Sequence, residues 1–377
     1  MTISRFSFPT DIQFGPGASR LVGDHLRERG FTRPIVVTDR GLATLPVLKN
    51  FVANLGAGLN VHLFAGVHGN PTASQAMQGR DAFRAQQADC VIGIGGGAAL
   101  DVAKVVALMA VHDGDVIEYA WDHAHVRPIT SELPYIVAVP TTSGTGSEVG
   151  RSSVVSDDTS HIKQVIFSPK LLAKAVFADP ELTIDLPPAV TAATGMDALT
   201  HNIESYLSPA FHPLCDGIAL EGVRIAARAL PIAVKDGRNL AARADMMMAS
   251  MMGAIAFQKD LGAVHSCAHA LGAVCDLHHG LANALMLEPV MRFNLDTARA
   301  KFAELAHVVG AGDPEDLVPW LMRLKREIGI APSLSAVGVQ RTQIPALVNI
   351  AEKDICHQTN PRPCTRDDFT RFFEQAM

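Results

Sequence analysis

Aromatic side chains, basic clusters and long apolar runs are scarce in this sequence, and each scarcity excludes a class of protein. Phe, Trp and Tyr make up only 6% of the 377 residues, so the core must rely on aliphatic side chains. Asp and Glu (38) outnumber Lys and Arg (32), with no basic cluster dense enough to follow a phosphate backbone, so we expect no nucleic-acid partner. No apolar run reaches the length that crosses a bilayer, and the first residues lack the pattern of an export signal, so we expect no membrane segment.

Closely paired cysteines are also missing. The six cysteines form no Cys-x-x-Cys motif and lie mostly in apolar contexts. In a chain of this length such cysteines are typical of reduced thiols. We therefore predict a soluble, cytoplasmic protein.

The chain is longer than one ordinary domain, so we expect two domains. Residues 1–184 differ from the rest in their pattern of apolar residues. Short β-branched or aliphatic runs bounded by Gly, Pro or Asp alternate there with amphipathic helical segments. This alternation indicates a Rossmann-like α/β domain, with a parallel sheet covered on both faces. The runs expected to be strands are Pro34–Thr38, Val61–Phe64, Cys90–Ile94 and Tyr135–Val139.

Residues 185–377 lack strand signals and favour helices. Long stretches rich in Ala, Met and Leu are separated there by Gly and Pro turns, which is typical of an all-helical domain. The expected helices include Ala189–Leu207, Cys215–Val234, Ala241–Ala256, Val264–Val274 and Leu281–Phe293.

A glycine-rich turn follows one predicted strand. Gly95-Gly96-Gly97-Ala98 connects Cys90–Ile94 to the helical pattern Leu100–Met109. Glycines let the backbone approach a ligand closely, and a helix N-terminus offers free N–H groups to a pyrophosphate. A tight strand-to-helix turn without a ligand has the same pattern, so this motif alone leaves both interpretations open.

Two further features favour a dinucleotide. Pro140-Thr-Thr-Ser-Gly-Thr-Gly-Ser-Glu148 follows the strand Tyr135–Val139, and its small hydroxyl residues suit hydrogen bonds to phosphate and ribose. Asp39 ends the strand Pro34–Thr38, where a carboxylate can bind ribose hydroxyls and repel a 2′-phosphate. Asp39 could equally be a turn residue before Gly41. Together with the glycine turn, these features favour NAD over NADP.

A metal site is expected in the helical half. Asp197 and His201 are four residues apart in one predicted helix, and His265 and His269 repeat that spacing in another. A carboxylate with three imidazoles suits Fe²⁺ or Zn²⁺. A single histidine in an apolar helix is more often a hydrogen-bonded core residue. Spacing does not select four ligands from the histidines here, or separate His278 from His279.

Together these motifs resemble the iron-containing (group III) alcohol dehydrogenases, in order and over the whole chain. The matching segments are Gly93-Ile-Gly-Gly-Gly-Ala-Ala-Leu-Asp101-Val-Ala-Lys104, Pro140 to Glu148, Gly195-Met-Asp-Ala-Leu-Thr-His-Asn-Ile-Glu204, His265-Ser-Cys-Ala-His-Ala-Leu-Gly272 and His279-Gly-Leu-Ala-Asn283. The resemblance implies the fold of that family and of dehydroquinate synthase-like enzymes: a dinucleotide-binding α/β domain followed by a helical metal-binding domain.

The resemblance also implies roles for individual residues. It implies the metal ligands Asp197, His201, His265 and His279, and it makes His269 a neighbouring histidine that relays a proton through the cofactor ribose to solvent. The implied cofactor-binding residues are Asp39, Asn70, Gly96, Gly97, Ala98, Asp101, Thr141, Thr142, Thr145 and Lys163. Ala98 departs from the family, which usually has Ser there, and this removes one hydroxyl contact to phosphate.

Substrate-pocket residues follow less directly. Ser152, Phe257 and Cys356 align roughly with pocket positions of the family, and Lys259 and Arg151 are close to them in sequence. A cation there would favour a hydroxy acid or its semialdehyde, although both cations could equally be solvated or structural.

The expected activity is hydride transfer between an alcohol and NAD(H), assisted by a bound metal ion. The resemblance implies Fe²⁺ as this ion, although Zn²⁺ accepts the same ligands. The resemblance implies a small alcohol or aldehyde substrate and a homodimer. Two alternatives keep the fold: a cofactor-recycling transhydrogenase, and a metal-dependent elimination without net NADH release. A catalytically silent binding protein is the alternative from another class.

Overall fold

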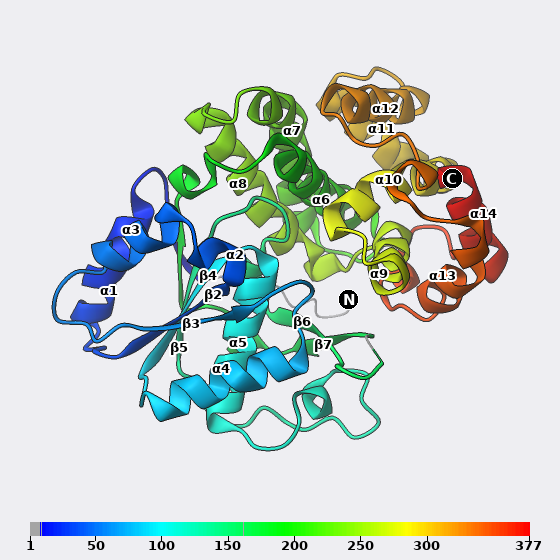
Figure 1. Cartoon of the computed structure of the whole chain (residues 1–377). Helices are drawn as coiled ribbons and strands as arrows, with labels where there is room; N and C mark the ends of the chain where they lie inside the picture. Colours follow the sequence, from blue (N-terminus) through cyan, green and yellow to red (C-terminus); the bar gives the residue numbers. More distant parts are fainter. Residues whose placement is uncertain (1–7, 9, 161) are drawn as a thin grey trace. The chain divides into compact units, whose positions relative to one another are not determined.

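The computed structural model describes residues 8, 10–160 and 162–377, which fold into two compact units (Figure 1). The first, here called the sheet unit, contains the described residues of 8–142 and 146–183. The second, the helical unit, contains residues 143–145 and 184–377. The expected fold class, a parallel α/β sheet followed by helices alone, is confirmed.

The sheet unit is built on a parallel sheet with the strand order β1-β8-β5-β4-β2-β3. Its strands are β1 (Asp11–Phe14), β2 (Pro34–Asp39), β3 (His62–Val67), β4 (Cys90–Gly95), β5 (Tyr135–Pro140) and β8 (Ala175–Ala178). All four predicted strands are present. The edge strand β1 and its neighbour β8 were not predicted, and neither was the small antiparallel pair of β6 (Ser152–Ser156) and β7 (Lys163–Phe167).

Apolar side chains on the two faces of this sheet pack against different helices. One face buries Val36 and Ile92 in a cluster with Leu26 of α1 (Val22–Glu28) and Phe51 of α3 (Pro46–Asn54). Helices α4 (Ala73–Ala85) and α5 (Gly97–Val111) pack together, and α5 lies against β4. Burial on both faces explains why the central strands are continuously apolar. Because β4 pairs in parallel with both β2 and β5, the carboxyl ends of these three strands are neighbours.

The helical unit surrounds one long buried helix, α6 (Pro188–Leu207). Small residues allow close packing there: a Cβ added to Gly195 would lie 2.2 Å from Leu230 Cδ1. The other helices are α7 (Pro213–Lys235), α8 (Leu240–Ala256), α9 (Ala263–Cys275), α10 (His279–Asn294), α11 (Arg299–Val309), α12 (Leu317–Glu327), α13 (Ile344–Ala351) and α14 (Arg366–Ala376).

One helical segment of the described chain, residues 240–259, is long and apolar enough to cross a membrane. Its most apolar window is 56% buried within the structure, and α8 packs extensively against α6 and α7. The segment is therefore a core helix.

Candidate functional site

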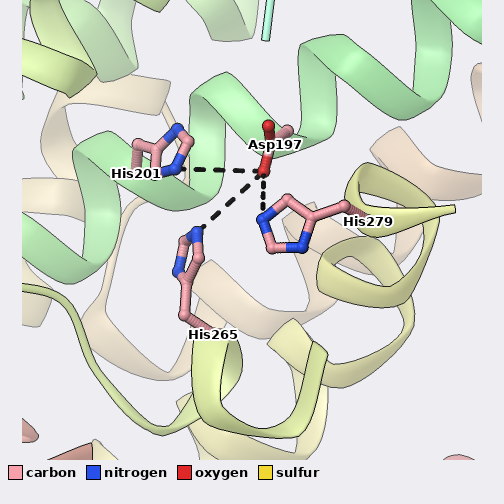
Figure 2. A group of neighbouring side chains, drawn as sticks. All are labelled: Asp197, His201, His265 and His279. Atoms are coloured by element: carbon pink, nitrogen blue, oxygen red, sulfur yellow. Dashed lines mark ion pairs between the residues drawn. The ribbon is translucent and has the colours of Figure 1, made fainter. Parts of the chain in front are cut away.

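Three helices of the helical unit bring four potential metal ligands together (Figure 2). Asp197 and His201 lie one turn apart on α6, His265 lies in the first turn of α9, and His279 begins α10. One donor atom from each residue lies within 4.8 Å of all the others. The group contains His279 and not its neighbour His278, a choice that spacing had left open.

The spacing of the donors fits a bound cation. The Oδ1 atom of Asp197 lies 4.0, 3.9 and 3.5 Å from the Nε2 atoms of His201, His265 and His279. These separations are too long for hydrogen bonds. Ligand atoms about 2.1 Å from a tetrahedral metal ion lie about 3.4 Å apart. The four side chains therefore have the donor chemistry and the separations of a divalent-metal site.

Burial keeps one of these histidines ready to bind a metal. It lowers the pKa of His201 to about 4, although the nearby Asp197 carboxylate acts in the opposite direction. A neutral imidazole offers a lone pair, so no proton needs to leave before a metal binds at neutral pH.

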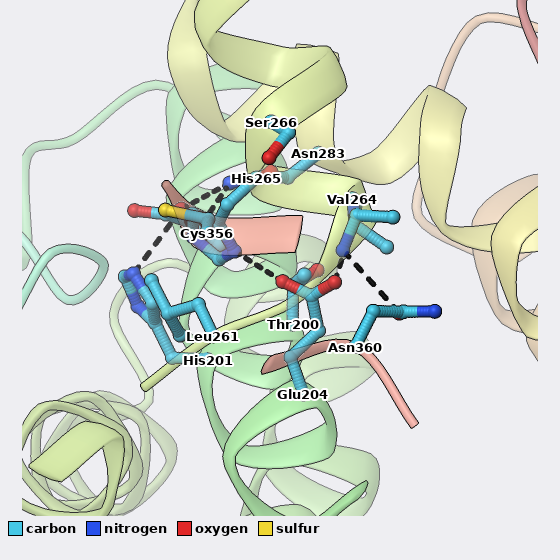
Figure 3. A network of polar contacts seen from close by, with 12 residues as sticks. Thr200, His201, Glu204, Leu261, Val264, His265, Ser266, Asn283, Cys356 and Asn360 are labelled. Atoms are coloured by element: carbon cyan, nitrogen blue, oxygen red, sulfur yellow. Dashed lines mark hydrogen bonds and ion pairs between the residues drawn. The ribbon is translucent and has the colours of Figure 1, made fainter. Parts of the chain in front are cut away.

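A second carboxylate of α6 orients His265 from behind (Figure 3). Glu204 Oε2 lies 2.6 Å from Nδ1 of His265, while Glu204 Oε1 accepts the N–H of Val264 at 2.8 Å. Burial raises the pKa of Glu204 to about 7, against the effect of hydrogen bonds from the backbone at the start of α9. A hydrogen held between Nδ1 and the carboxylate places the lone pair of His265 on Nε2, the atom that would bind a metal.

An amide on α10 contacts the same donors. Asn283 Nδ2 donates to Asp197 Oδ1 at 2.7 Å and lies 3.3 Å from the Nε2 atoms of both His265 and His279. The residue is completely buried, so its amide can fix the Asp197 carboxylate.

Glu204 and Asn283 had been given no role from the sequence. Spacing did carry a signal for both: Glu204 follows Asp197 by seven residues and His201 by three, and Asn283 follows His279 by four. These intervals place each residue on the same helix face as a ligand.

His269 lies beside the four ligands without belonging to their group. It is one turn beyond His265 on α9, and its ring stacks on that of His279 with centroids 5.4 Å apart. The proton-relay role expected of His269 stays a prediction.

In the sheet unit, some of the predicted cofactor residues lie at the carboxyl ends of β2, β4 and β5: Asp39, Gly96, Gly97, Ala98, Thr141 and Thr142. Gly95 has φ +144°, and Gly96 precedes α5 without any side-chain cap, so the first N–H groups of this helix are not capped by its own N-cap residue. Asp39 Oδ2 lies 3.3 Å from the position of a Cβ on Gly95, and Asp39 Oδ1 accepts the N–H of Leu42. Asp39 thus also caps a short helix, as its alternative interpretation expects.

The threonine-rich loop reaches the same edge of the sheet. The Thr141 N–H donates to the Gly95 carbonyl at 3.0 Å, and Thr142 Oγ1 lies 3.4 Å from the position of a Cβ on Gly96. Thr145, predicted to join them, is grouped with the helical unit. Gly96 precedes α5, Gly97 and Ala98 begin it, and all three are partly exposed.

Asp101 is occupied by contacts within the protein. Its carboxylate accepts the Ser147 hydroxyl at 2.6 Å and the Val154 N–H at 3.0 Å, and it lies 4.0 Å from the ammonium of Lys104. These contacts tie α5 to the loop that follows β5, so they favour a positioning role over the predicted direct contact with the cofactor.

Asn70 and Lys163 both lie close to the end of β6. The Ser156 N–H donates to the carbonyl of Pro71, next to Asn70, and Ser156 pairs with Lys163 across the two short strands. Their predicted contacts with the cofactor stay predictions.

The predicted substrate-pocket residues have varied surroundings. The Phe257 ring lies 5.4 Å from that of His201, next to the metal ligands. Lys259 is fully enclosed and pairs with Asp216, which argues against its binding an anionic substrate because its charge is already neutralised. In the sheet unit, the Ser152 carbonyl accepts a hydrogen bond from Lys104, and the Arg151 guanidinium lies over the Phe167 ring.

Comparisons with known proteins agree with this arrangement. The family model for iron-containing alcohol dehydrogenase matches residues 9–180, and that for the C-terminal part of the Fe-containing alcohol dehydrogenase family matches residues 191–377. The chain is 37% identical to a 4-hydroxybutyrate dehydrogenase of Cupriavidus necator over 98% of each chain.

Solved structures of related proteins have the same fold as this chain. The crystal structure of a 1,3-propanediol oxidoreductase superposes with a TM-score of 0.95 at 37% identity over all of both chains. A sulfoacetaldehyde reductase from Bifidobacterium kashiwanohense in complex with NAD⁺ superposes with a TM-score of 0.90 at 28% identity, over 100% of this chain and 99% of that one. With its buried Asp-His₃ metal site, the chain belongs to the iron-containing alcohol dehydrogenase family, as a metal-dependent, NAD(H)-linked alcohol/aldehyde oxidoreductase.

Proposed function

We propose that the chain interconverts a short primary alcohol and its aldehyde with NAD(H), using Fe²⁺ held by Asp197, His201, His265 and His279. The observation that carries this proposal is the convergence of one carboxylate and three imidazoles at one point, with three of the four residues buried. When bound there, the ion supplies Lewis-acid polarisation of the substrate oxygen.

The protein's own residues prepare this reaction. Glu204 and Asn283 hold the ligands His265 and Asp197 in the orientations described above. His269, whose ring stacks on that of the ligand His279, takes part in moving the proton that alcohol oxidation releases.

The cofactor would bind at the strand ends of the sheet unit. Asp39 would accept hydrogen bonds from the adenosine ribose, and the backbone of Gly96, Gly97 and Ala98 would bind the pyrophosphate. Further contacts are proposed for Asn70, Thr141, Thr142, Thr145 and Lys163.

We propose a substrate that carries a second polar group at the far end of a short chain. 4-Hydroxybutyrate and 1,3-propanediol, after which two similar proteins are named, share a terminal CH₂OH group and a second oxygen function three or four carbons along the chain. Phe257, beside His201, and Cys356 would then line the pocket.

The cellular location and the assembly of the enzyme are two further proposals. No disulfide joins any of the six cysteines, all of which belong to the described residues, as in a reducing compartment, so we propose a cytoplasmic location. The homodimer expected from the family remains our proposal for its assembly.

The test is an anaerobic assay of metal-stripped protein with NAD⁺ and a panel of short alcohols, diols and hydroxy acids. We expect Fe²⁺ to restore NADH formation in the wild type and not in His265→Ala, while His307→Ala, a change on α11, behaves as the wild type. Restoration by Zn²⁺ alone would replace iron in the proposal. Tight binding of metal and NAD⁺ without any NADH would favour the transhydrogenase or elimination reaction, and failure to bind metal would contradict the site.

A further inference from the structure

A carboxylate from the C-terminal part of the helical unit faces the histidine beside the metal ligands. Asp354 follows α13, and its Oδ2 atom lies 2.7 Å from Nδ1 of His269 on α9. The two residues are far apart in sequence, so the sequence motifs did not connect them.

Other contacts fix this carboxylate in place. Its Oδ1 atom accepts the Ser266 hydroxyl at 2.8 Å and the Cys356 N–H at 2.9 Å. Ser266 in turn accepts the N–H of His357 at 2.9 Å. Because Oδ1 is engaged by two donors, Oδ2 is directed to His269.

The surroundings also keep Asp354 ionised. Burial alone would raise the pKa of this carboxyl, but the nearby His269 and the hydrogen bonds from His269, Cys356 and Ser266 outweigh that effect and hold it well below its usual range. An ionised carboxylate is only an acceptor, so the Nδ1 atom of His269 must carry the hydrogen between them.

We propose that Asp354 is a positioning residue that holds His269 with hydrogen on Nδ1 and Nε2 as the proton-exchanging atom. The inference rests on the proposed function. In alcohol oxidation the C–H bond breaks and its electron pair leaves with hydrogen to NAD⁺, while the hydroxyl proton is released. His269 Nε2 accepts that proton and passes it toward solvent, which returns the ring to its starting state.

This arrangement differs from a second metal site. His269, Asp354 and Cys356 do offer donors within 4.8 Å of one another. The Asp354 oxygens are already engaged by His269, Ser266 and Cys356, however, and burial raises the pKa of the Cys356 thiol well above its usual value, so it is not a thiolate ligand.

The direct test is the tautomer of His269, read by ¹⁵N NMR of the metal-free protein at mildly alkaline pH. The signals are assigned by comparison with His269→Gln. We expect the Nδ1–H form in the wild type and a shift toward the Nε2–H form in Asp354→Asn, whose amide can donate to Nδ1. A wild type in the Nε2–H form would overturn the proposal.

Kinetics of the iron-loaded enzyme provide the second test. We expect Asp354→Asn to lower kcat about 100-fold, as for loss of one general acid–base group, with metal affinity and alcohol KM unchanged. The double variant with His269→Gln should be no slower than His269→Gln alone, because both changes remove one function. Asp367→Asn, an exposed carboxylate in the first turn of α14, is the matched control and should keep wild-type activity.

The outcomes separate the two proposals. If His269→Gln is slow and Asp354→Asn is fast, or if Asp354→Asn loses metal, the positioning role is wrong although the dehydrogenase function stands. If the wild type forms no NADH with any alcohol, the proposed function fails, whereas the tautomer measurement still decides the role of Asp354.

Discussion

His265 lies between two carboxylates of the same helix, with Glu204 Oε2 2.6 Å from its Nδ1 atom and Asp197 Oδ1 3.9 Å from its Nε2 atom. Asp197 and Glu204 are two turns apart on α6, which places both on one face. One helix thus supplies a metal ligand and the group that orients a ligand from another helix.

The first prediction concerns this orientation. We expect Glu204→Gln to weaken metal binding about 10- to 100-fold, because glutamine has one accepting oxygen where Glu204 uses two, so its NH₂ group must face either the Nδ1–H of His265 or the N–H of Val264. Competition with a chelator measures the affinity. Glu327→Gln, a change at the exposed end of α12, should leave it unchanged. Equal affinities of Glu204→Gln and the wild type would mean that backbone packing alone orients His265.

The second prediction concerns Gly280, next to the ligand His279. A Cβ at Gly280 would lie 2.2 Å from the carbonyl oxygen of Ala193 on α6. Gly280→Ala must therefore push α10 away from α6, which we expect to lower the free energy of unfolding by about 1–3 kcal/mol and to weaken metal binding. Denaturant unfolding and metal titration measure the two effects.

Gly217 provides the control for this substitution. It lies within α7, where an added Cβ meets no atom within 4 Å. Gly217→Ala should stabilise the protein by about 0.5–1 kcal/mol, because alanine loses less conformational entropy in a helix. If both variants were equally stable, close packing at Gly280 would not be limiting.

The third prediction concerns Lys104, whose ammonium is buried in the sheet unit. It donates to Ser147 Oγ at 2.9 Å and to the carbonyls of Gly150 and Ser152 at 3.1 and 2.7 Å. Lys104→Met leaves these acceptors and Asp101 without their cation, so we expect unfolding to cost about 3 kcal/mol less. Loosening of the same loop should also weaken NADH binding, followed by fluorescence. The exposed Lys49→Met should change neither quantity.

The fourth prediction is a dependence of stability on pH. Burial raises the pKa of Glu148 to about 7 from its usual 4.5, and the nearby Lys104 offsets this only in part. The folded state therefore binds more protons than the unfolded state between these values, and stability falls as pH rises through this window. The full shift corresponds to about 3 kcal/mol.

Glu148→Gln isolates this contribution, because glutamine does not titrate. We expect the stability of the wild type relative to Glu148→Gln to fall between pH 4.5 and 7 and to stay level above that range. Denaturant unfolding at several pH values measures the difference. A difference that is flat across the window would show that Glu148 ionises normally in the folded protein.

Local patterns were sufficient to predict the class of fold and four of the strands. The segments that form β2, β4 and β5 are apolar throughout because both faces of the sheet are covered. A continuous apolar run of this kind, bounded by turn residues, can be recognised in the sequence alone. The edge strand β1 and its neighbour β8 were missed because each has only four residues, and their pairing with each other joins parts far apart along the chain.

The metal site was predictable in its types and spacing, because Asp197 and His201 must share one face of any helix that contains them. The sequence by itself thus determined that an α/β part is followed by a helical part, which residue types bind the metal, and where the glycine turn lies. Spacing left His278 and His279 open, and the resemblance implied His279. Only the tertiary structure brought the donor of His279 together with the other three, enclosed Lys259 with Asp216, and joined Asp354 to His269. These contacts form between side chains of different segments of the helical unit. Which atoms meet is set by the packing of those segments and not by spacing along the chain.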